Sequence, residues 1–243
     1  MPHFFVDSRN RVNDLITIND SENYRHIARA LRARVGESLL LIDEAQIQYE
    51  TKITEINSTE IICHIEKSYL SKRDLDFDLY LAQSPLRSDA QLTIMEKATE
   101  LGVRGVYPVI TDNCALNKSV LEKKLEKWQK VMYEASKQCE RAKVPTCFDI
   151  TTFDKLFEQD FDKIMVLAER STEISFKDFL RKNPIKKGEK VLVVIGPEGG
   201  FSQREFDLFK SRNLPLISLG DLILKAETAV IVTLGDITYE YQG

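Results

Sequence analysis

The chain has few residues of the kinds that hold metals. It contains three histidines and four cysteines in 243 residues, and no two cysteines form a Cys-x-x-Cys pair. Zinc sites need such residues at short, regular spacings. We therefore expect no bound metal, and we expect the thiols to be reduced and structural. The residues concerned are His3, His26, His64, Cys63, Cys114, Cys139 and Cys147.

Long hydrophobic runs are also missing. The longest apolar stretches are a few residues, whereas a membrane-spanning helix needs about 20. The first residues, Met-Pro-His-Phe-Phe-Val-Asp, lack the basic start and apolar stretch of a signal peptide. We expect a cytoplasmic protein. Its 43% hydrophobic content is enough for one large domain or two small ones.

Positive charge is unevenly distributed in a chain whose net charge is −4. Residues 1–51 contain no lysine but six arginines, and Arg25, Arg29 and Arg32 would share one face of a helix starting near Ser21. Arginine pairs well with phosphate, so this face is a candidate RNA contact. Alternatively, it is a solvated face paired with nearby acidic residues.

The hydrophobic pattern changes along the chain. Three short β-like stretches at 38–43, 47–53 and 60–65 predict a small antiparallel barrel. The charged stretch 67–76 is interpreted as a linker. Strands then alternate with helices, which predicts an α/β unit with a parallel sheet. We expect a helix over 90–101 and strands at 77–82, 105–110, 163–168, 191–195 and 215–219.

Two further helices are expected. The first is amphipathic, with an apolar face for the core or a subunit interface. It carries Leu121, Leu125, Trp128, Met132, Ala135 and Cys139. The second covers Ala226–Tyr241, although its β-branched run Val230–Thr233 would suit a strand equally well.

Two segments near the C-terminus run from an apolar stretch into small or polar residues. They are Val191-Leu-Val-Val-Ile-Gly-Pro-Glu-Gly-Gly200 and Leu219-Gly-Asp-Leu-Ile-Leu-Lys-Ala-Glu-Thr-Ala229. Each has the length needed to leave a buried strand and expose backbone groups to a ligand. The glycine spacing matches neither the dinucleotide fingerprint nor a P-loop. The first segment is a candidate ligand loop or a plain strand-to-helix connection, and Ser202 and Glu205 predict a capping box after it.

These motifs together resemble the RsmE family of S-adenosylmethionine-dependent methyltransferases, in the SPOUT (trefoil-knot) superfamily. Phe4-Phe5-Val6, Glu96-Lys-Ala-Thr-Glu-Leu-Gly-Val103 and Glu134-Ala-Ser-Lys-Gln-Cys139 are also similar to the family. The resemblance implies a PUA-like RNA-binding β-barrel over residues 1–70 and a SPOUT α/β-knot methyltransferase domain over 75–243. Periodicity alone would never predict a knot.

The resemblance further implies that S-adenosylmethionine binds three loops, at 167–169, 195–200 and 219–229, at a homodimer interface. Backbone groups would bind adenine and ribose, and Ile223 and Leu224 would form an apolar wall. The implied cofactor-binding residues are Leu167, Ala168, Ile195, Gly196, Pro197, Glu198, Gly199, Gly200, Leu219, Gly220, Ile223, Leu224, Glu227, Thr228 and Ala229.

The family's reaction is methylation of uridine N3 in 16S ribosomal RNA, at the decoding-site position U1498. Glu198, Lys225 and Glu227 are the catalytic candidates. Either carboxylate would balance the sulfonium charge of the cofactor, or merely cap a helix. Lys225 stands where the family usually has arginine; it keeps the positive charge but loses the planar fork.

Other departures from the family pattern fall at expected RNA-facing positions. They are Arg87-Ser88-Asp89, Asn113-Cys-Ala115 and Glu140. They leave open a methyltransferase acting on another RNA site, or a ribosome-assembly factor without turnover. The partner implied first is 16S ribosomal RNA or the small subunit. The candidate RNA-binding residues are Arg9, Arg11, Arg25, Arg29, Arg32, Arg87, Glu134, Gln138, Arg141 and Lys143.

Overall fold

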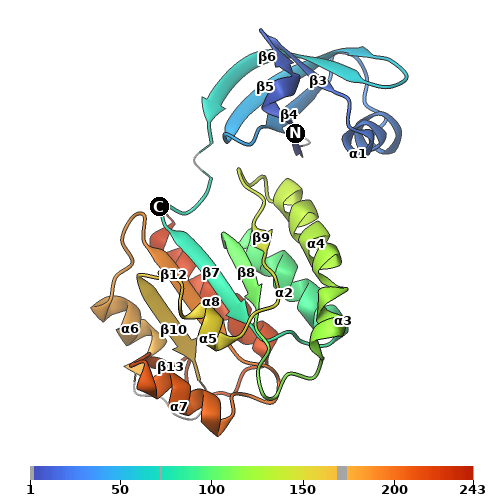
Figure 1. The fold of residues 1–243 in the computed structure, drawn as a ribbon. Coiled ribbons are helices and arrows are strands. Elements are labelled where there is room, and N and C mark those ends of the chain that lie inside the picture. The colour runs from blue at the N-terminus through green and yellow to red at the C-terminus, as the bar shows by residue number, and fades with distance from the viewer. Residues whose placement is uncertain (1–2, 72, 169–173, 243) are drawn as a thin grey trace. The chain divides into compact units, whose positions relative to one another are not determined.

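Buried apolar side chains gather in separate cores that divide the chain into two units. The computed structural model describes residues 3–71, 73–168 and 174–242. The N-terminal unit is Met1–Asp74 together with Lys137–Lys143, and the C-terminal unit is Leu75–Ser136 together with Val144–Gly243 (Figure 1). The N-terminal unit is therefore built from two separate stretches of chain.

The N-terminal unit contains a six-stranded sheet in the order β1-β4-β5-β6-β3-β2. Alternate residues such as Ile16 and Ile18, or Leu39 and Leu41, point into its core, as expected for strands with one buried face. The strands are β1 His3–Phe5, β2 Arg11–Val12, β3 Leu15–Ile18, β4 Ser38–Ile42, β5 Ile47–Ile56 and β6 Ile61–Leu70. A 3₁₀ turn, η1, covers Ser8–Asn10.

Two expectations for this unit need correction. The sheet is not purely antiparallel, because β1 pairs with β4 in parallel. The linker begins later than expected, because β6 continues to Leu70 along the start of β5. Lys67 pairs with Glu50 across these strands at 3.6 Å, so part of the charged stretch belongs to the sheet.

The arginine-rich segment forms one short helical stretch. Helix α1, Ser21–Tyr24, continues into the π-helical segment η2, Arg25–Ala30. Arg32 follows the helix with a positive φ of 53°. The expected single face of Arg25, Arg29 and Arg32 is therefore wrong for Arg32, because the wider π-helical turn and the left-handed residue break the 3.6-residue period.

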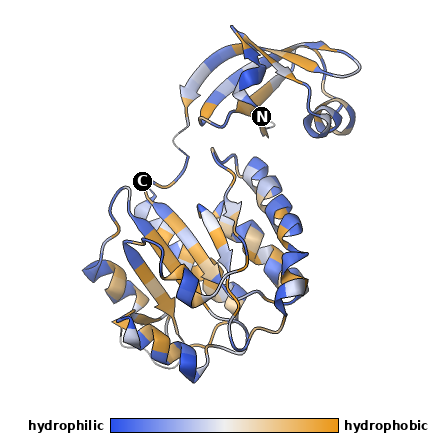
Figure 2. Ribbon diagram, viewed as in Figure 1, coloured by the Kyte–Doolittle hydropathy of each residue, from blue (hydrophilic) through white to orange (hydrophobic). Residues whose placement is uncertain are grey.

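The C-terminal unit contains a seven-stranded sheet in the order β11-β13-β10-β12-β7-β8-β9, and every pair in it is parallel. Its central strands are apolar on both faces, which is typical of a sheet covered on both sides (Figure 2). The strands are β7 Asp78–Gln83, β8 Gly105–Pro108, β9 Thr146–Cys147, β10 Lys163–Leu167, β11 Ile174–Ser175, β12 Lys190–Ile195 and β13 Leu216–Ser218.

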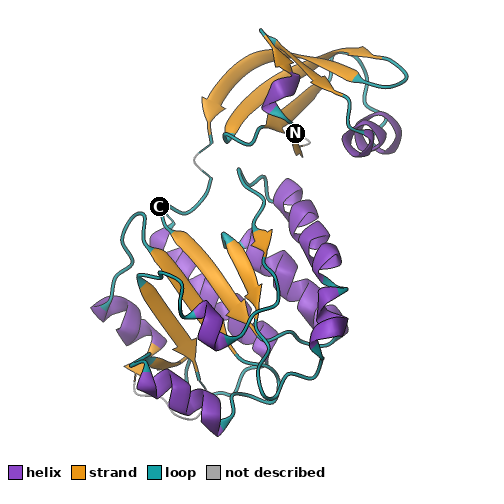
Figure 3. Ribbon diagram, in the orientation of Figure 1, coloured by secondary structure: helices purple, strands orange, loops and turns teal. Residues whose placement is uncertain are grey.

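Helices cover both faces of this sheet (Figure 3). Val191, Val193 and Ile195 of β12 pack in the core formed with α2, α4, α6 and α8. Leu192 and Val194 pack in the opposite core, formed with α5 and α7. The helices are α2 Ser88–Glu100, α3 Lys118–Glu122, α4 Leu125–Gln138, α5 Phe153–Leu156, α6 Phe176–Lys182, α7 Gln203–Ser211 and α8 Ala226–Tyr241.

The two further helices expected from the sequence have different outcomes. The amphipathic stretch is not one helix: α3 ends at Glu122 and α4 begins at Leu125, and Cys139 lies beyond it. The C-terminal helix is confirmed over Ala226–Tyr241. Burial of Val230, Leu234 and Ile237 on one side stabilises it despite its β-branched run.

Candidate functional site

A cavity of about 820 Å³ lies in the C-terminal unit, at the carboxyl ends of β10, β12 and β13. This is the edge at which parallel α/β sheets bind their ligands. The residues that line it are Ala90, Leu167, Ala168, Ile195, Gly196, Pro197, Glu198, Gly199, Gly200, Phe201, Phe206, Ile217, Ser218, Leu219, Gly220, Leu222, Ile223, Leu224, Lys225, Ala226, Glu227 and Ala229.

One wall is the glycine-rich loop, which we define as residues 196–200, between β12 and α7. The Gly200 N–H donates to the Pro197 carbonyl at 2.9 Å, which closes a tight turn. Gly200 has a φ of +67°, a conformation that side chains with a Cβ rarely adopt. At Gly196, an added Cβ would lie 3.2 Å from the Phe201 ring, so the loop leaves little room for a larger residue there.

A buried carboxylate fixes the end of this loop. The predicted capping box is present: Glu205 accepts from the Ser202 N–H at 2.8 Å, and the Ser202 hydroxyl accepts from the Glu205 N–H at 3.2 Å. Glu205 is only 1% exposed and also accepts from the Asp112 N–H at 3.0 Å. Helix α7 therefore starts at a defined point next to the cavity.

The opposite wall is the loop from β13 to α8. The Gly220 N–H donates to the Ser218 hydroxyl at 3.1 Å, and that hydroxyl donates to the Gly220 carbonyl at 2.9 Å. Leu222 and Ile223 are 82% and 63% exposed at the rim. Lys225 is the N-cap residue directly before α8, so the cavity faces the positive end of the α8 dipole.

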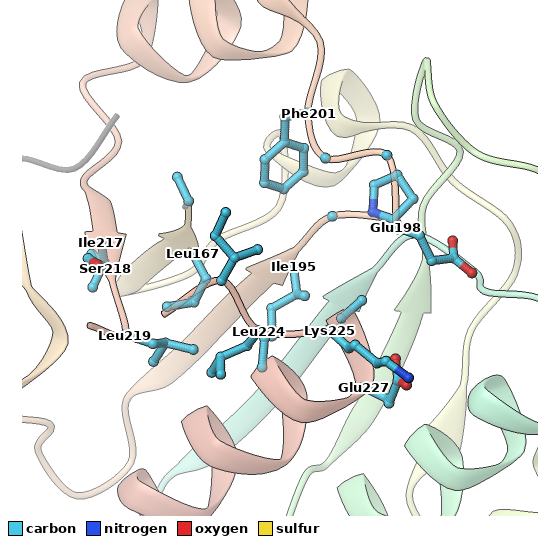
Figure 4. Close-up of a pocket in the computed structure, with 18 of the residues that line it drawn as sticks. Leu167, Ile195, Glu198, Phe201, Ile217, Ser218, Leu219, Leu224, Lys225 and Glu227 are labelled. Carbon is cyan, nitrogen blue, oxygen red and sulfur yellow. The ribbon is translucent and has the colours of Figure 1, made fainter. Parts of the chain in front are cut away.

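Charged and apolar side chains lie on different parts of the cavity wall. Figure 4 shows Lys225 and Glu227 at the start of α8 and Glu198 on the glycine-rich loop. Leu167, Ile217, Leu219 and Leu224 form the apolar part. Such a wall suits a ligand that combines an apolar ring with a charged group.

The structure brings together nearly all of the residues proposed from the sequence for the cofactor. Of that set, Thr228 does not line the cavity. Glu169, the last residue of the expected 167–169 loop, lies outside the described residues. Five lining residues lie outside the three predicted loops: Ala90 of α2, Ile217 and Ser218 of β13, and the aromatic residues Phe201 and Phe206. In the sequence, the only indication of this aromatic part of the wall was that Phe201 and Phe206 flank the capping-box residues Ser202 and Glu205.

The candidate RNA-binding residues are spread over both units. Arg25, Arg29 and Arg32 are exposed, as are Arg87, Gln138 and Lys143. Arg9 pairs with Asp7 at 2.5 Å. The Arg11 guanidinium lies 5.3 Å from the centre of the Tyr49 ring. Glu134 is partly buried on α4.

Arg141 requires a correction. Its residue is only 3% exposed, and both Nε and one terminal nitrogen lie 2.9 Å from Oδ1 of Asp74 within the N-terminal unit. A guanidinium held in this way is a structural ion pair, because binding a phosphate would require leaving its carboxylate partner. Lys143, which is near Arg141 in the sequence and exposed, remains a candidate for an RNA contact.

The parts of the chain that the structure describes contain no helix long and apolar enough to cross a membrane. Within the same residues, no three histidine, cysteine or acidic side chains are grouped to hold a metal ion.

A parallel α/β sheet with a loop-built pocket at its carboxyl edge, preceded by a small β unit, defines an enzyme with an accessory β domain. Residues 73–238 match a family model described as an RNA methyltransferase domain, and residues 18–66 match an RNA methyltransferase PUA domain. The chain belongs to this RNA methyltransferase family. The predicted fold class is confirmed as an α/β methyltransferase unit with a parallel sheet, preceded by a PUA-like unit.

Similar proteins extend over the full chain. The Ribosomal RNA small subunit methyltransferase E of Bacillus subtilis is 28% identical over 99% of this chain and 97% of its own length. The protein with the same name from Aquifex aeolicus is 29% identical over 94% and 96%. The structure of the Neisseria gonorrhoeae methyltransferase E bound to S-adenosyl methionine is similar, with a TM-score of 0.83, 21% identity and coverage of 99% and 98%.

Proposed function

We propose that this protein transfers a methyl group from S-adenosylmethionine to uridine N3 of 16S ribosomal RNA, in the cytoplasm. The observation that carries the proposal is that residues of both the 195–200 and the 219–229 loops line the same cavity. The names of the similar Bacillus subtilis and Aquifex aeolicus proteins support the RNA substrate. The Neisseria gonorrhoeae structure, which holds S-adenosyl methionine, supports the methyl donor.

The residues present fit this cofactor. Leu167, Ile217, Leu219 and Leu224 provide the apolar surface that an adenine ring requires. The glycine-rich loop lets a ligand approach its backbone closely. Glu198 and Glu227 line the same cavity, and their carboxylates would balance a positive sulfonium. The bound cofactor supplies an activated methyl group.

The chain's own residues then have to position the uridine and favour its reactive form. The N3 proton of uridine is only weakly acidic, so the site must stabilise negative charge as that proton leaves. Lys225 supplies a cation at the cavity wall, and the amino end of α8 adds to it. We assign Lys225 to this stabilisation, with Glu198 and Glu227 as the carboxylates beside the methyl donor.

The decisive test is methyl transfer from labelled S-adenosylmethionine to unmodified small subunits and to naked 16S RNA, followed by mapping of the modified nucleotide. We expect label at N3 of the decoding-site uridine, U1498. Label at another nucleotide would support a methyltransferase with a different RNA site. Cofactor binding without label in either substrate would favour an assembly factor that has no turnover.

We also propose that the protein acts as a homodimer formed through the C-terminal unit. Leu222 and Ile223 at the cavity rim are strongly exposed, at 82% and 63%. Exposed apolar side chains in one region are typical of an interface. Sedimentation equilibrium is expected to give twice the monomer mass of 27.9 kDa. A monomer at micromolar concentration would contradict the proposal.

A further inference from the structure

Three consecutive residues that do not line the cavity lie against its glycine-rich loop. Thr111, Asp112 and Asn113 follow β8, and we call them the 111–113 segment. Each residue has a different partner. Thr111 is buried, and its hydroxyl shares a 2.7 Å hydrogen bond with that of Ser84, just after β7. This bond ties the segment to the edge of the sheet.

Asp112 ties the segment to the start of α7. Its carboxylate accepts from the Ser202 hydroxyl at 2.5 Å and pairs with the Arg204 guanidinium at 2.6 and 3.0 Å. These two partners hold the pKa of Asp112 below its ordinary value, with Arg204 contributing most. Because the Asp112 N–H also donates to buried Glu205, the segment and the start of α7 are joined at several points.

Asn113 contacts the glycine-rich loop itself. Its side-chain amide donates to the Gly199 carbonyl at 3.2 Å and to the Gly200 carbonyl at 3.0 Å. The fit is close, because a Cβ added to Gly199 would lie 3.1 Å from the Asn113 Cβ. Gly200 is the residue with the left-handed φ, and glycine is the residue that loses most conformational freedom when it is fixed.

We propose that Asn113 is a positioning residue for the methyl donor. It holds the Gly199 and Gly200 carbonyls, so the glycine-rich loop keeps its ligand-binding shape before the ligand arrives. The inference rests on the proposed function for the identity of the ligand. The loop-ordering part can be tested without any ligand.

The first experiment is hydrogen exchange of the free protein, followed for the peptide that contains residues 196–203. Asn113→Ala removes both hydrogen bonds and is expected to speed exchange of this peptide at least threefold. Asn113→Asp keeps the side-chain size but offers no donor to the two carbonyls, so it is expected to speed exchange at least as much. Unchanged exchange in both variants would overturn the positioning role.

The second experiment is calorimetric binding of S-adenosylmethionine. Both Asn113 variants are expected to raise Kd about three- to tenfold, with an unchanged melting temperature. Gln203→Glu is the control for charge, because it places a negative charge at exposed Gln203, near the loop, where the side chain contacts Asp207 of α7 and neither of the two carbonyls. Wild-type affinity in both Asn113 variants would overturn the inference, whereas no binding by the wild type would overturn the proposed cofactor.

Discussion

Single backbone positions decide the shape of the cavity. Gly200 holds a φ of +67° in open space, so its importance is conformational and no neighbour would clash with a side chain there. Gly196 is limited differently, by the nearby Phe201 ring. Two glycines of one motif are therefore needed for two separate physical reasons.

We expect Gly200→Val to weaken S-adenosylmethionine binding about tenfold. A β-branched residue is disfavoured in the left-handed region by about 1–2 kcal/mol, and the loop would relax away from its binding shape. Gly200→Asn is the matched variant, because asparagine tolerates positive φ, and it should bind nearly as well as the wild type. Calorimetry checks both, and equal loss in the two variants would contradict the conformational explanation.

His3 gives the N-terminal unit a pH-dependent stability. Burial lowers the pKa of His3 from its ordinary 6.5 to about 4, so the folded unit favours the neutral ring. Above pH 6.5 the ring is neutral in both folded and unfolded chains. As the pH falls from 6.5 towards 4, only the unfolded chain gains the proton, and stability is lost, by on the order of 3 kcal/mol at most.

Urea unfolding at pH 7 and pH 4.5 measures this effect. His3→Phe keeps an aromatic ring of similar shape without a titrating group, so the loss of stability between the two pH values should be smaller. His64→Phe, at an exposed position of β6, provides the comparison. An equal loss in the wild type and in His3→Phe would show that other groups cause the acid sensitivity.

At the scale of the element, the start of α7 connects the glycine-rich loop to the rest of the C-terminal unit. Glu205 accepts two backbone N–H groups, one from Ser202 and one from Asp112, while almost fully buried. The same side chain therefore caps the helix and anchors the 111–113 segment.

Glu205→Ala should destabilise the protein by about 2–3 kcal/mol, because two N–H groups lose a charged acceptor. The thermal midpoint of the C-terminal unit is expected to fall by several degrees. Exposed Glu240→Ala, at the end of α8, makes the same chemical change without these contacts and should leave the midpoint within about 1 °C. Scanning calorimetry is the measurement, and matching midpoints for the two variants would refute the anchoring role.

The sequence predicted elements where one local pattern dominates. The β12 strand and the capping box follow from an apolar run and a two-residue signature, whereas the β-branched run in α8 suited a strand as well as the helix that forms. Prediction from the sequence was wrong where the bounds of an element depend on the conformation of a few residues or on pairing with a strand distant in the sequence. The π-helical segment η2, the break between α3 and α4, and the extension of β6 along β5 are of this kind.

The candidate site shows the same division. The two C-terminal loops were identified from their own residues together with the family resemblance, and they meet in the cavity. In the 111–113 segment, only Asn113 was noticed, as a departure from the family pattern. The contacts of Asn113 with Gly199 and Gly200 join residues that are 86 and 87 positions apart, so a local sequence pattern cannot predict them. A knot is likewise a property of the whole path of the chain.

At the scale of the whole molecule, the arginines of the N-terminal unit and the cavity of the C-terminal unit would serve one RNA. Arg25 and Arg29 lie in the same short helical stretch and are exposed. In the proposed function they supply phosphate contacts, which contribute affinity that depends on salt and not on base sequence.

Arg29→Ala is expected to weaken binding to 16S RNA about two- to fivefold and to reduce the salt slope by about one. The control is Arg181→Ala, which removes an exposed arginine from α6. Filter binding from 50 to 200 mM salt compares them with the wild type. A slope that stays the same in Arg29→Ala would show that this arginine makes no phosphate contact.

The N-terminal unit is completed by residues 137–143, which lie in the sequence between the two stretches that form the C-terminal unit. A protease cut or a gene fusion placed after Asp74 would separate this stretch from residues 1–74 and divide the Arg141–Asp74 pair between two products. The first product would lack part of the N-terminal unit, and the second would carry residues 137–143 without the rest of that unit. An N-terminal unit taken from another protein would therefore not replace this one unless residues 137–143 were exchanged with it.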